Sequence, residues 1–210
     1  MTESAPPLHD LPLFPLQSVL FPGGLLSLKV FEARYLDLVS RCLREHAPFG
    51  VVCLNQGTET RQPGAPAERF EAVGTLARLD QVDAEQVGML RVRCLGGQRF
   101  RGGIPVRDAD GLWHTDATLI DADPVLAPTP ELTATVVALH NAVTALHAQG
   151  QHPFVQPYQW DDAGWVANRW CELLPIPLAA KQKLMELQQP MGRLQLVHEY
   201  LRGKGVVGPG

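Results

Sequence analysis

The sequence has no apolar run near the roughly 18 residues that a membrane-spanning helix needs. Residues 1–10 have neither a positively charged segment nor an apolar core, so we expect a loose tail there and no signal peptide. The four cysteines stand far apart without a CxxC pair, which favours reduced, buried thiols over a metal or redox motif. These absences predict a cytoplasmic protein with no membrane partner.

Positive charge is also scarce. Lysine and arginine total 18 against 22 aspartates and glutamates, so the formal net charge is -4. Nucleic-acid-binding domains usually carry a basic surface, and nucleic acid is therefore not the expected partner. A chain of 210 residues buries enough surface to fold without a staple, so we expect neither a metal nor another cofactor.

Catalytic motifs are missing as well. The only Gly-Lys pair, Gly203-Lys204, is followed by Gly205, where a phosphate-binding P-loop needs serine or threonine. The serines lie within the first forty residues and none occupies a GxSxG elbow. His140 and His147 fall near one helix face, but no carboxylate stands at the HExxH position. We expect no ATPase, peptidase or metal-dependent activity and assign no catalytic residue.

Residues 11–35 organise the β-rich part of the chain. The run 11–15 holds two prolines, which remove backbone donors and favour the edge or opening of a sheet. Apolar and polar residues alternate over 26–31, which predicts a half-buried strand. This strand runs into a helix whose stripe includes Leu36, Val39 and Leu43, with Tyr35 and its helical neighbours beside it.

Further strand signals follow. Residues 55–69 predict an exposed loop, 80–86 an acidic loop, and Gly74 a bend within a strand at 70–79. A three-residue loop at 96–98 would form a hairpin with Phe100 opposite Cys94, because a slip of one residue would expose Phe100. Other expected strands span 49–54, 104–106 and 113–120. The pattern predicts a compact, partly closed β-barrel with one inserted helix.

Composition changes at 121–130, where three prolines occur, and we place the domain boundary there. We expect a β subdomain at 8–122, a helical subdomain at 128–203, and flexible tails at 1–7 and 204–210. Helices are predicted at 131–148, from Asp161 or Asp162 to about 174, at 177–187 and at 190–202. Their short connections favour an antiparallel four-helix bundle, so the fold class is α+β.

Three short segments carry a family resemblance: LPLFPL at 11–16, VLFPG at 19–23 and FEARY at 31–35. They resemble the opening of the N-terminal substrate-binding domain of Lon proteases, and later landmarks extend the likeness to about Leu201. The resemblance implies a PUA-like β subdomain followed by a helical bundle. Full-length Lon proteases also carry ATPase and Ser–Lys protease modules, whose motifs are absent here. The expectation is therefore a stand-alone, non-enzymatic relative.

Two groups of residues are candidates for a binding cleft. Glu32 and Arg34 stand at the strand-to-helix junction, either as a structural ion pair (with Arg99 as another partner for Glu32) or as the polar lip of a cleft. The aromatic loop at 152–160 either seals the helical part against the barrel or offers exposed apolar anchors. The candidate cleft comprises Phe31, Glu32, Arg34, Tyr35, Arg99, Phe154, Tyr158 and Trp160.

Three functions follow as hypotheses. The leading one is binding of unfolded or partly folded polypeptide in an apolar groove between barrel and bundle. The second is RNA binding through a stripe of arginines, Arg91, Arg93, Arg99 and Arg101, because PUA-like folds include RNA binders. The third is an adaptor or regulator that docks on a separate protease or chaperone.

Overall fold

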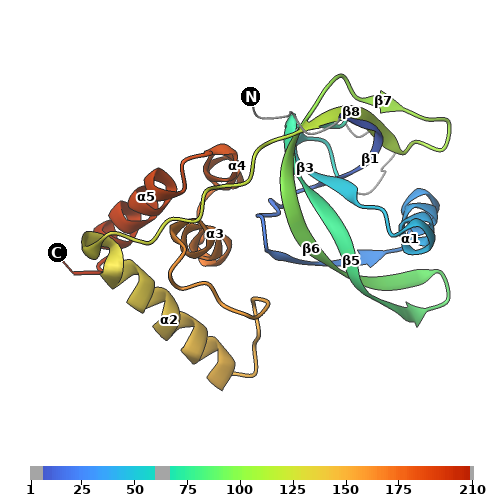
Figure 1. Ribbon diagram of the computed structural model, residues 1–210. Helices are drawn as coiled ribbons and strands as arrows, with labels where there is room; N and C mark the ends of the chain where they lie inside the picture. Colours follow the sequence, from blue (N-terminus) through green and yellow to red (C-terminus); the bar gives the residue numbers. More distant parts are fainter. Residues whose placement is uncertain (1–6, 60–66, 209–210) are drawn as a thin grey trace. The chain divides into compact units, whose positions relative to one another are not determined.

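The computed structural model describes residues 7–59 and 67–208. The chain divides between Ala122 and Asp123 into two compact units, which we call the β unit and the helical unit (Figure 1). Of the predicted tails, 1–6 and 209–210 lie outside the described residues, as does 60–66 of the predicted loop. At the other end, 204–208 forms a hydrogen-bonded turn in which Val207 is buried, so this part differs from the flexible tail we expected.

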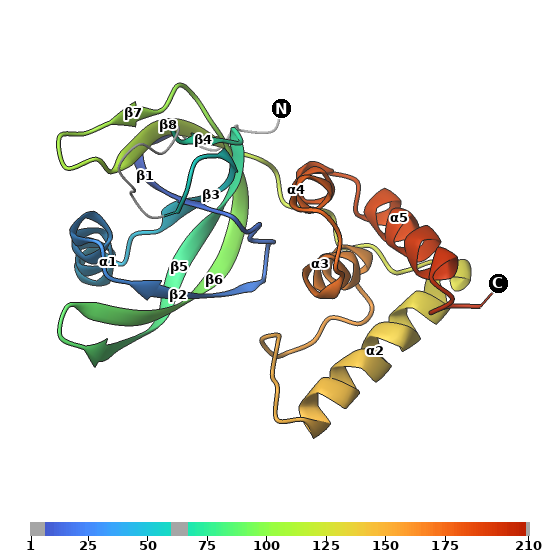
Figure 2. The same cartoon turned by 180° about the vertical axis from the view of Figure 1, so that it is seen from behind.

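The β unit is a sheet that closes on itself. Its elements are β1 (Leu8–Leu16), β2 (Leu25–Val30), α1 (Ala33–Glu45), β3 (Phe49–Gln56), β4 (Arg69–Phe70), β5 (Val73–Gln86), β6 (Met89–Gly102), β7 (Val106–Arg107) and β8 (Trp113–Leu119). The strand order is β2-β6-β5-β3-β1-β8-β7, and an additional β6–β8 pairing joins five of the strands into a ring. The inserted helix α1 lies beside this ring (Figure 1; Figure 2). The mixed fold and the partly closed sheet are as predicted.

Strand β1 corrects one prediction. We expected its prolines at a sheet edge, yet β1 lies between β3 and β8. The pairing is staggered: β8 pairs with the Leu8–Leu13 half and β3 with the Leu13–Leu16 half. Pro12 and Pro15 each face one paired neighbour and one open side, so a central strand tolerates both missing donors.

The helix α1 buries a narrower face than predicted. Tyr35, Leu38, Val39 and Cys42 are buried, whereas Leu43 is exposed. Strand β2 follows its predicted alternation, with Ser27 and Lys29 exposed between better-covered apolar residues. Both elements therefore turn one apolar face to the same hydrophobic core.

The hairpin of β5 and β6 was placed wrongly by sequence reasoning. The predicted acidic loop 80–86 is strand, and the turn falls at 87–88. Acidic β5 lies beside arginine-bearing β6, and Arg93 Nε donates to Asp80 at 2.5 Å. Such cross-strand pairs of opposite charge favour strand over loop.

The predicted loop 96–98 lies inside β6. Gly96 and Gly24 pair closely, because the Gly96 N–H donates to the Gly24 carbonyl at 2.8 Å and the Gly23 N–H donates to the Gly96 carbonyl at 2.8 Å. A Cβ on Gly96 would lie 2.2 Å from the carbonyl oxygen of Phe21. The glycine thus marks a close approach of two backbones and not a turn.

The helical unit contains a short 3₁₀ turn at Pro130–Leu132 and four helices: α2 (Thr133–Ala148), α3 (Ala163–Leu173), α4 (Leu178–Glu186) and α5 (Pro190–Gly203). Of the two predicted capping residues, Asp161 and Asp162, Asp162 caps α3 by accepting a hydrogen bond from the Gly164 N–H at 3.0 Å. α3 is almost wholly buried and contacts α2, α4 and α5. The unit is organised around α3, and the antiparallel four-helix bundle stays a prediction.

A buried arginine connects three parts of the helical unit. Arg193 on α5 donates to the Asn168 side chain at 2.5 Å, to the Asp123 carboxylate at 2.6 Å and to the Leu187 carbonyl at 2.6 Å. Arg193 is only 1% exposed, so these partners take the place of water around its guanidinium. In addition, the Ala163 N–H donates to the Leu126 carbonyl at 2.8 Å. Within the part of the chain that the structure describes, no helix is both long and apolar enough to cross a membrane.

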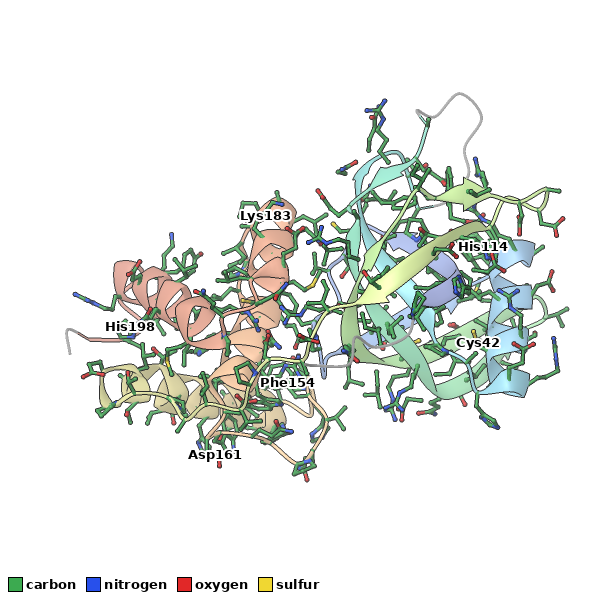
Figure 3. All side chains as sticks on the ribbon, turned by 45° about the horizontal axis from the view of Figure 1, so that its top comes forward. Cys42, His114, Phe154, Asp161, Lys183 and His198 are labelled. Carbon is green, nitrogen blue, oxygen red and sulfur yellow. The ribbon has the colours of Figure 1, made fainter. Side chains whose placement is uncertain are left out.

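All four cysteines, Cys42, Cys53, Cys94 and Cys171, are free and buried. Figure 3 shows Cys42 on the side of α1 that faces the sheet. Burial raises the pKa of every thiol from its ordinary value of 9.0, to about 11 for Cys53 and to about 12 for Cys94 and Cys171. A thiol reacts as the thiolate, so two effects make these groups unreactive: reagents cannot reach the buried sulfur, and the thiol keeps its proton at neutral pH.

We therefore expect no reaction with Ellman's reagent at neutral pH in the native protein, and four equivalents of thiol per chain in denaturant. Stability falls as the pH rises above about 9, because thiols of the unfolded chain lose their protons before the buried ones do. Absorbance at 412 nm and urea titrations at several pH values measure both effects. A cysteine that reacts within minutes in the native state would contradict the burial described here.

Candidate functional site

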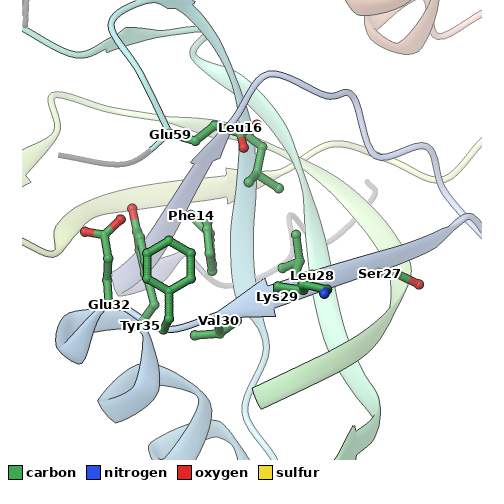
Figure 4. A pocket seen from close by; sticks show the side chains of 10 residues that line it. Phe14, Leu16, Ser27, Leu28, Lys29, Val30, Glu32, Tyr35 and Glu59 are labelled. Atoms are coloured by element: carbon green, nitrogen blue, oxygen red, sulfur yellow. The ribbon is translucent and has the colours of Figure 1, made fainter. Parts of the chain in front are cut away.

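A pocket of about 250 Å³ lies in the β unit, where β1, β2 and the start of α1 meet (Figure 4). We call it the β2 pocket. Its apolar wall comes from Phe14, Leu16, Leu28, Val30, Phe31 and Tyr35, and its polar lining from Ser27, Lys29, Glu32 and Glu59. Pockets of this kind, mostly apolar with few polar groups, are the usual sites of side-chain or ligand capture.

Part of the apolar wall is an aromatic stack. The rings of Phe14 and Tyr35 are parallel, with centroids 3.8 Å apart and planes inclined by 8°. Both residues are buried, and burial raises the pKa of the Tyr35 phenol well above its ordinary value, so the ring stays neutral. Figure 4 shows Glu32 and Tyr35 on one side of the pocket, with Leu28 and Lys29 on the other. The two stacked rings come from different elements, Phe14 from β1 and Tyr35 from α1.

Arg34 braces this pocket from outside its lining. Its guanidinium donates to Glu32 at 3.1 Å and to the Gly111 carbonyl at 2.8 Å, and it lies 4.5 Å from the centre of the Tyr35 ring. Arg34 is buried. The structural ion pair that we considered for Glu32 and Arg34 is thus present, and the same Glu32 also lines the pocket. Arg34 thus contacts both Glu32 and Tyr35, two residues of the pocket lining.

Arg99, the remaining candidate of the β unit, does not belong to the pocket. Arg99 is buried in β6 and is not among the residues that line the β2 pocket. Phe31, Glu32 and Tyr35, by contrast, share one pocket. Sequence reasoning missed the other seven lining residues, Phe14, Leu16, Ser27, Leu28, Lys29, Val30 and Glu59. The alternation in β2 did not group them, because it placed Leu28 and Val30 on one face of the strand and Ser27 and Lys29 on the other.

The aromatic candidates of the helical unit stack on one another. Phe154 is buried and makes an edge contact with Trp165, while Arg169 lies over both rings at 5.4 Å and 5.7 Å from their centres. Tyr158 and Trp160 are half-buried, and each packs against Trp165. Phe154 is therefore a packing residue, because Arg169 and Trp165 cover its faces. The side chains of Tyr158 and Trp160 remain partly exposed to solvent.

Two histidines of helix α2 belong to the same packing. His140 lies 5.2 Å from Trp160 between ring centres, and the His147 ring nitrogen lies 3.0 Å from the Tyr158 hydroxyl. Over the described ranges 7–59 and 67–208, no group of three or more His, Cys, Asp or Glu side chains is placed to hold a metal ion.

The arginine stripe proposed for RNA is not a continuous basic surface. Arg99 is buried, and the exposed Arg91 and Arg93 form ion pairs with Glu85 at 2.9 Å and Asp80 at 2.5 Å. Acidic β5 thus balances the charges of Arg91 and Arg93, whereas Arg101 is exposed on β6. A nucleic-acid surface needs uncompensated positive charge along the phosphate backbone, and the ion pairs reduce that charge at two of the four stripe positions.

Comparisons with known proteins point in one direction. The family model of the ATP-dependent protease La (LON) substrate-binding domain matches residues 10–203. The chain is 27% identical over 214 residues to the Lon protease of Anaeromyxobacter dehalogenans (strain 2CP-C), which covers 92% of this chain. It spans only 23% of the length of that protease.

Two solved structures share the architecture. The Lon N-terminal domain protein from Xanthomonas campestris has 31% identity and a TM-score of 0.71, covering 92% of this chain and 99% of that one. The N-terminal domain of the Mycobacterium avium complex Lon protease has 14% identity and a TM-score of 0.59, covering 91% and 97%. At that lower identity the second likeness concerns the fold alone.

Proposed function

We propose, from the premise that this chain belongs to the family of Lon substrate-binding domains, that it is a non-enzymatic module that binds polypeptide. The family membership confirms the resemblance predicted from the three opening segments. The match concerns the substrate-binding part of the Lon architecture and 23% of the length of the matching protease. A recognition role needs a surface for apolar side chains and no reacting groups, and the β2 pocket supplies such a surface.

The observation that supports the proposal most directly is the exposed ring beside the pocket. Phe31 is 50% exposed and lines the pocket next to the buried stack of Phe14 and Tyr35. Contiguous exposed apolar surface, unlike a single exposed side chain, marks an interaction site, and Phe31 continues the apolar wall of the pocket. Unfolded or partly folded polypeptides present apolar side chains of the required kind. Tyr158 and Trp160 on the helical unit offer further aromatic surface for the same class of ligand.

Two finer points belong to the proposal. We infer that the ligand is handed to, or received from, a protease or chaperone partner, because Lon proteases couple recognition to later processing. We also infer a cytoplasmic location, which the four free, buried cysteines support, since unpaired thiols persist in reducing compartments.

The test is a fluorescence titration with a labelled, permanently unfolded protein, such as one that has been reduced and carboxymethylated. We expect saturable binding below about 100 μM, the weak end of ordinary recognition. Phe31→Ala should weaken the affinity about tenfold, because aromatic anchors dominate binding energy. Stability should change little, since half of the ring is already in water.

Val87→Ala is the matched control. Val87 is a fully exposed apolar residue of the same unit, in the turn between β5 and β6 and outside the pocket lining. Its replacement should leave the affinity unchanged. Absence of binding by the unaltered protein at about 100 μM would remove the proposed function. If both variants lost affinity equally, the polypeptide would not bind at the β2 pocket.

A further inference from the structure

Strand β2 is one of the two open ends of the sheet, opposite β7 in the strand order. It begins the strand order and, among the strands that the structure describes, pairs with β6 alone. In an antiparallel pair, alternate residues direct their N–H and C=O groups toward the partner strand, and the others direct theirs away. About half of the backbone groups of β2 therefore point away from β6, and such an edge is a template for another strand.

The β2 pocket lies along this edge. Its lining includes consecutive residues of β2 and the adjoining Phe31 and Glu32. Across the pocket stand Phe14 and Leu16, in the half of β1 that pairs with β3 but lies beyond the last β8 partner, Leu13. Figure 4 shows the ribbons of β1 and β2 bordering the labelled side chains. Two strand edges and one apolar hollow thus meet at a single place.

We propose that the edge of β2 takes up an extended polypeptide segment as an additional strand, with one bulky apolar side chain of that segment in the β2 pocket. This inference rests on the proposed function and specifies the conformation and chemistry of the substrate. Strand addition obtains affinity from main-chain hydrogen bonds and selectivity from pockets for alternate side chains. It suits a domain that must bind many sequences, because every unfolded segment carries the same backbone.

The charges of the lining refine the ligand. Lys29 is engaged by Glu85, with its Nζ 3.0 Å from the carboxylate, and Glu32 is engaged by Arg34. Glu59 accepts the Gln17 N–H at 2.6 Å and leaves an acidic group at the pocket. The site therefore favours a neutral or basic segment over an acidic one.

The test uses fluorescent peptides of about nine residues with one central phenylalanine among threonines and lysines. Two derivatives carry backbone N-methyl groups at alternate positions, one set on each side of the extended peptide. A strand-added peptide turns only one set of N–H groups toward β2, and a slip of one residue would turn the phenylalanine away from the pocket. We expect one N-methyl set to lower the affinity about tenfold or more through lost hydrogen bonds, and the other to leave it unchanged.

Further peptides examine the pocket and the charge. Replacing the central phenylalanine by aspartate, or the lysines by glutamates, should abolish or weaken binding. If both N-methyl sets bind like the parent peptide, strand addition is wrong while polypeptide binding stands. If neither the parent peptide nor an unfolded protein binds at about 100 μM, the proposed function itself fails. A peptide-resistant dimer in sedimentation velocity would assign the edge to a second copy and overturn the inference.

Discussion

Replacing Arg193 by leucine is expected to destabilise the helical unit by about 3–5 kcal/mol, the cost of breaking a buried charged network from one side. The guanidinium is 1% exposed and donates to Asn168, Asp123 and the Leu187 carbonyl. Leucine fills part of the volume but supplies no donor. The buried Asn168 amide then loses this donor without gaining water, and the partly buried Asp123 carboxylate loses its ion pair with Arg193.

Urea titrations followed by tryptophan fluorescence measure this effect, because Trp160, Trp165 and Trp170 all lie in the helical unit. The matched control is Arg202→Leu, an exposed arginine on the same helix, which should cost less than about 1 kcal/mol. Arg193→Lys should fall between the two, since an ammonium cannot reproduce the planar fork of donors. A loss at Arg193 no larger than at Arg202 would show that the network contributes little.

Gly96→Ala should destabilise the β unit by about 3 kcal/mol, the upper end for overpacking a well-packed interior. The new Cβ would lie 2.2 Å from the carbonyl oxygen of Phe21 and 3.1 Å from Leu20 Cγ. The obstacle is backbone, which cannot rotate aside as a side-chain tip can. Relief requires β6 to move away from the turn at 23–24, and that movement breaks the paired hydrogen bonds between Gly96 and this turn.

The neighbouring Gly97→Ala provides the control. Its Cβ would meet the Leu76 carbonyl oxygen at 3.4 Å and Leu76 Cβ at 3.7 Å, which are ordinary contacts. Both substitutions remove a glycine from the same strand, so the difference between them isolates the close approach at Gly96. Differential scanning calorimetry should show a lowered transition for Gly96→Ala alone. Equal transition temperatures would mean that the backbones can separate at little cost.

Local patterns predicted the local elements well. The alternation at 26–31 gave β2, the prolines at 177 and 190 marked the starts of α4 and α5, and Asp162 marked the cap of α3. These signals depend on the conformational preferences of a few adjacent residues. They need no knowledge of what packs against the element.

Which distant segments of the chain pack or pair with each other could not be predicted from local patterns. Gly96 and Gly97 look like a turn, but the need for glycine at 96 comes from Phe21, a residue 75 positions away in the chain. Pro12 and Pro15 suggest an edge because the stagger of β3 and β8 along β1 has no local signature. In each case the deciding neighbour is distant in sequence.

The residues of the candidate site show the same difference between local and distant signals. Phe31, Glu32 and Tyr35 were found together because one short segment carries all three. Phe14 and Glu59 reach the same pocket from other elements, and nothing in their immediate sequence announces it. Phe154 is aromatic and lies in a loop, yet Arg169 and Trp165 cover it.

The ion pair between Arg193 and Asp123 determines where a fragment that contains the helical unit alone should begin. A fragment cut at residue 128, where composition placed the start of that half, would omit both Asp123 and the Leu126 carbonyl that receives the Ala163 N–H. A fragment starting at 123 and extending through the buried Val207 retains these contacts. The five residues 123–127 at the N-terminus of the fragment thus determine whether the buried guanidinium of Arg193 keeps the Asp123 carboxylate as its counter-ion.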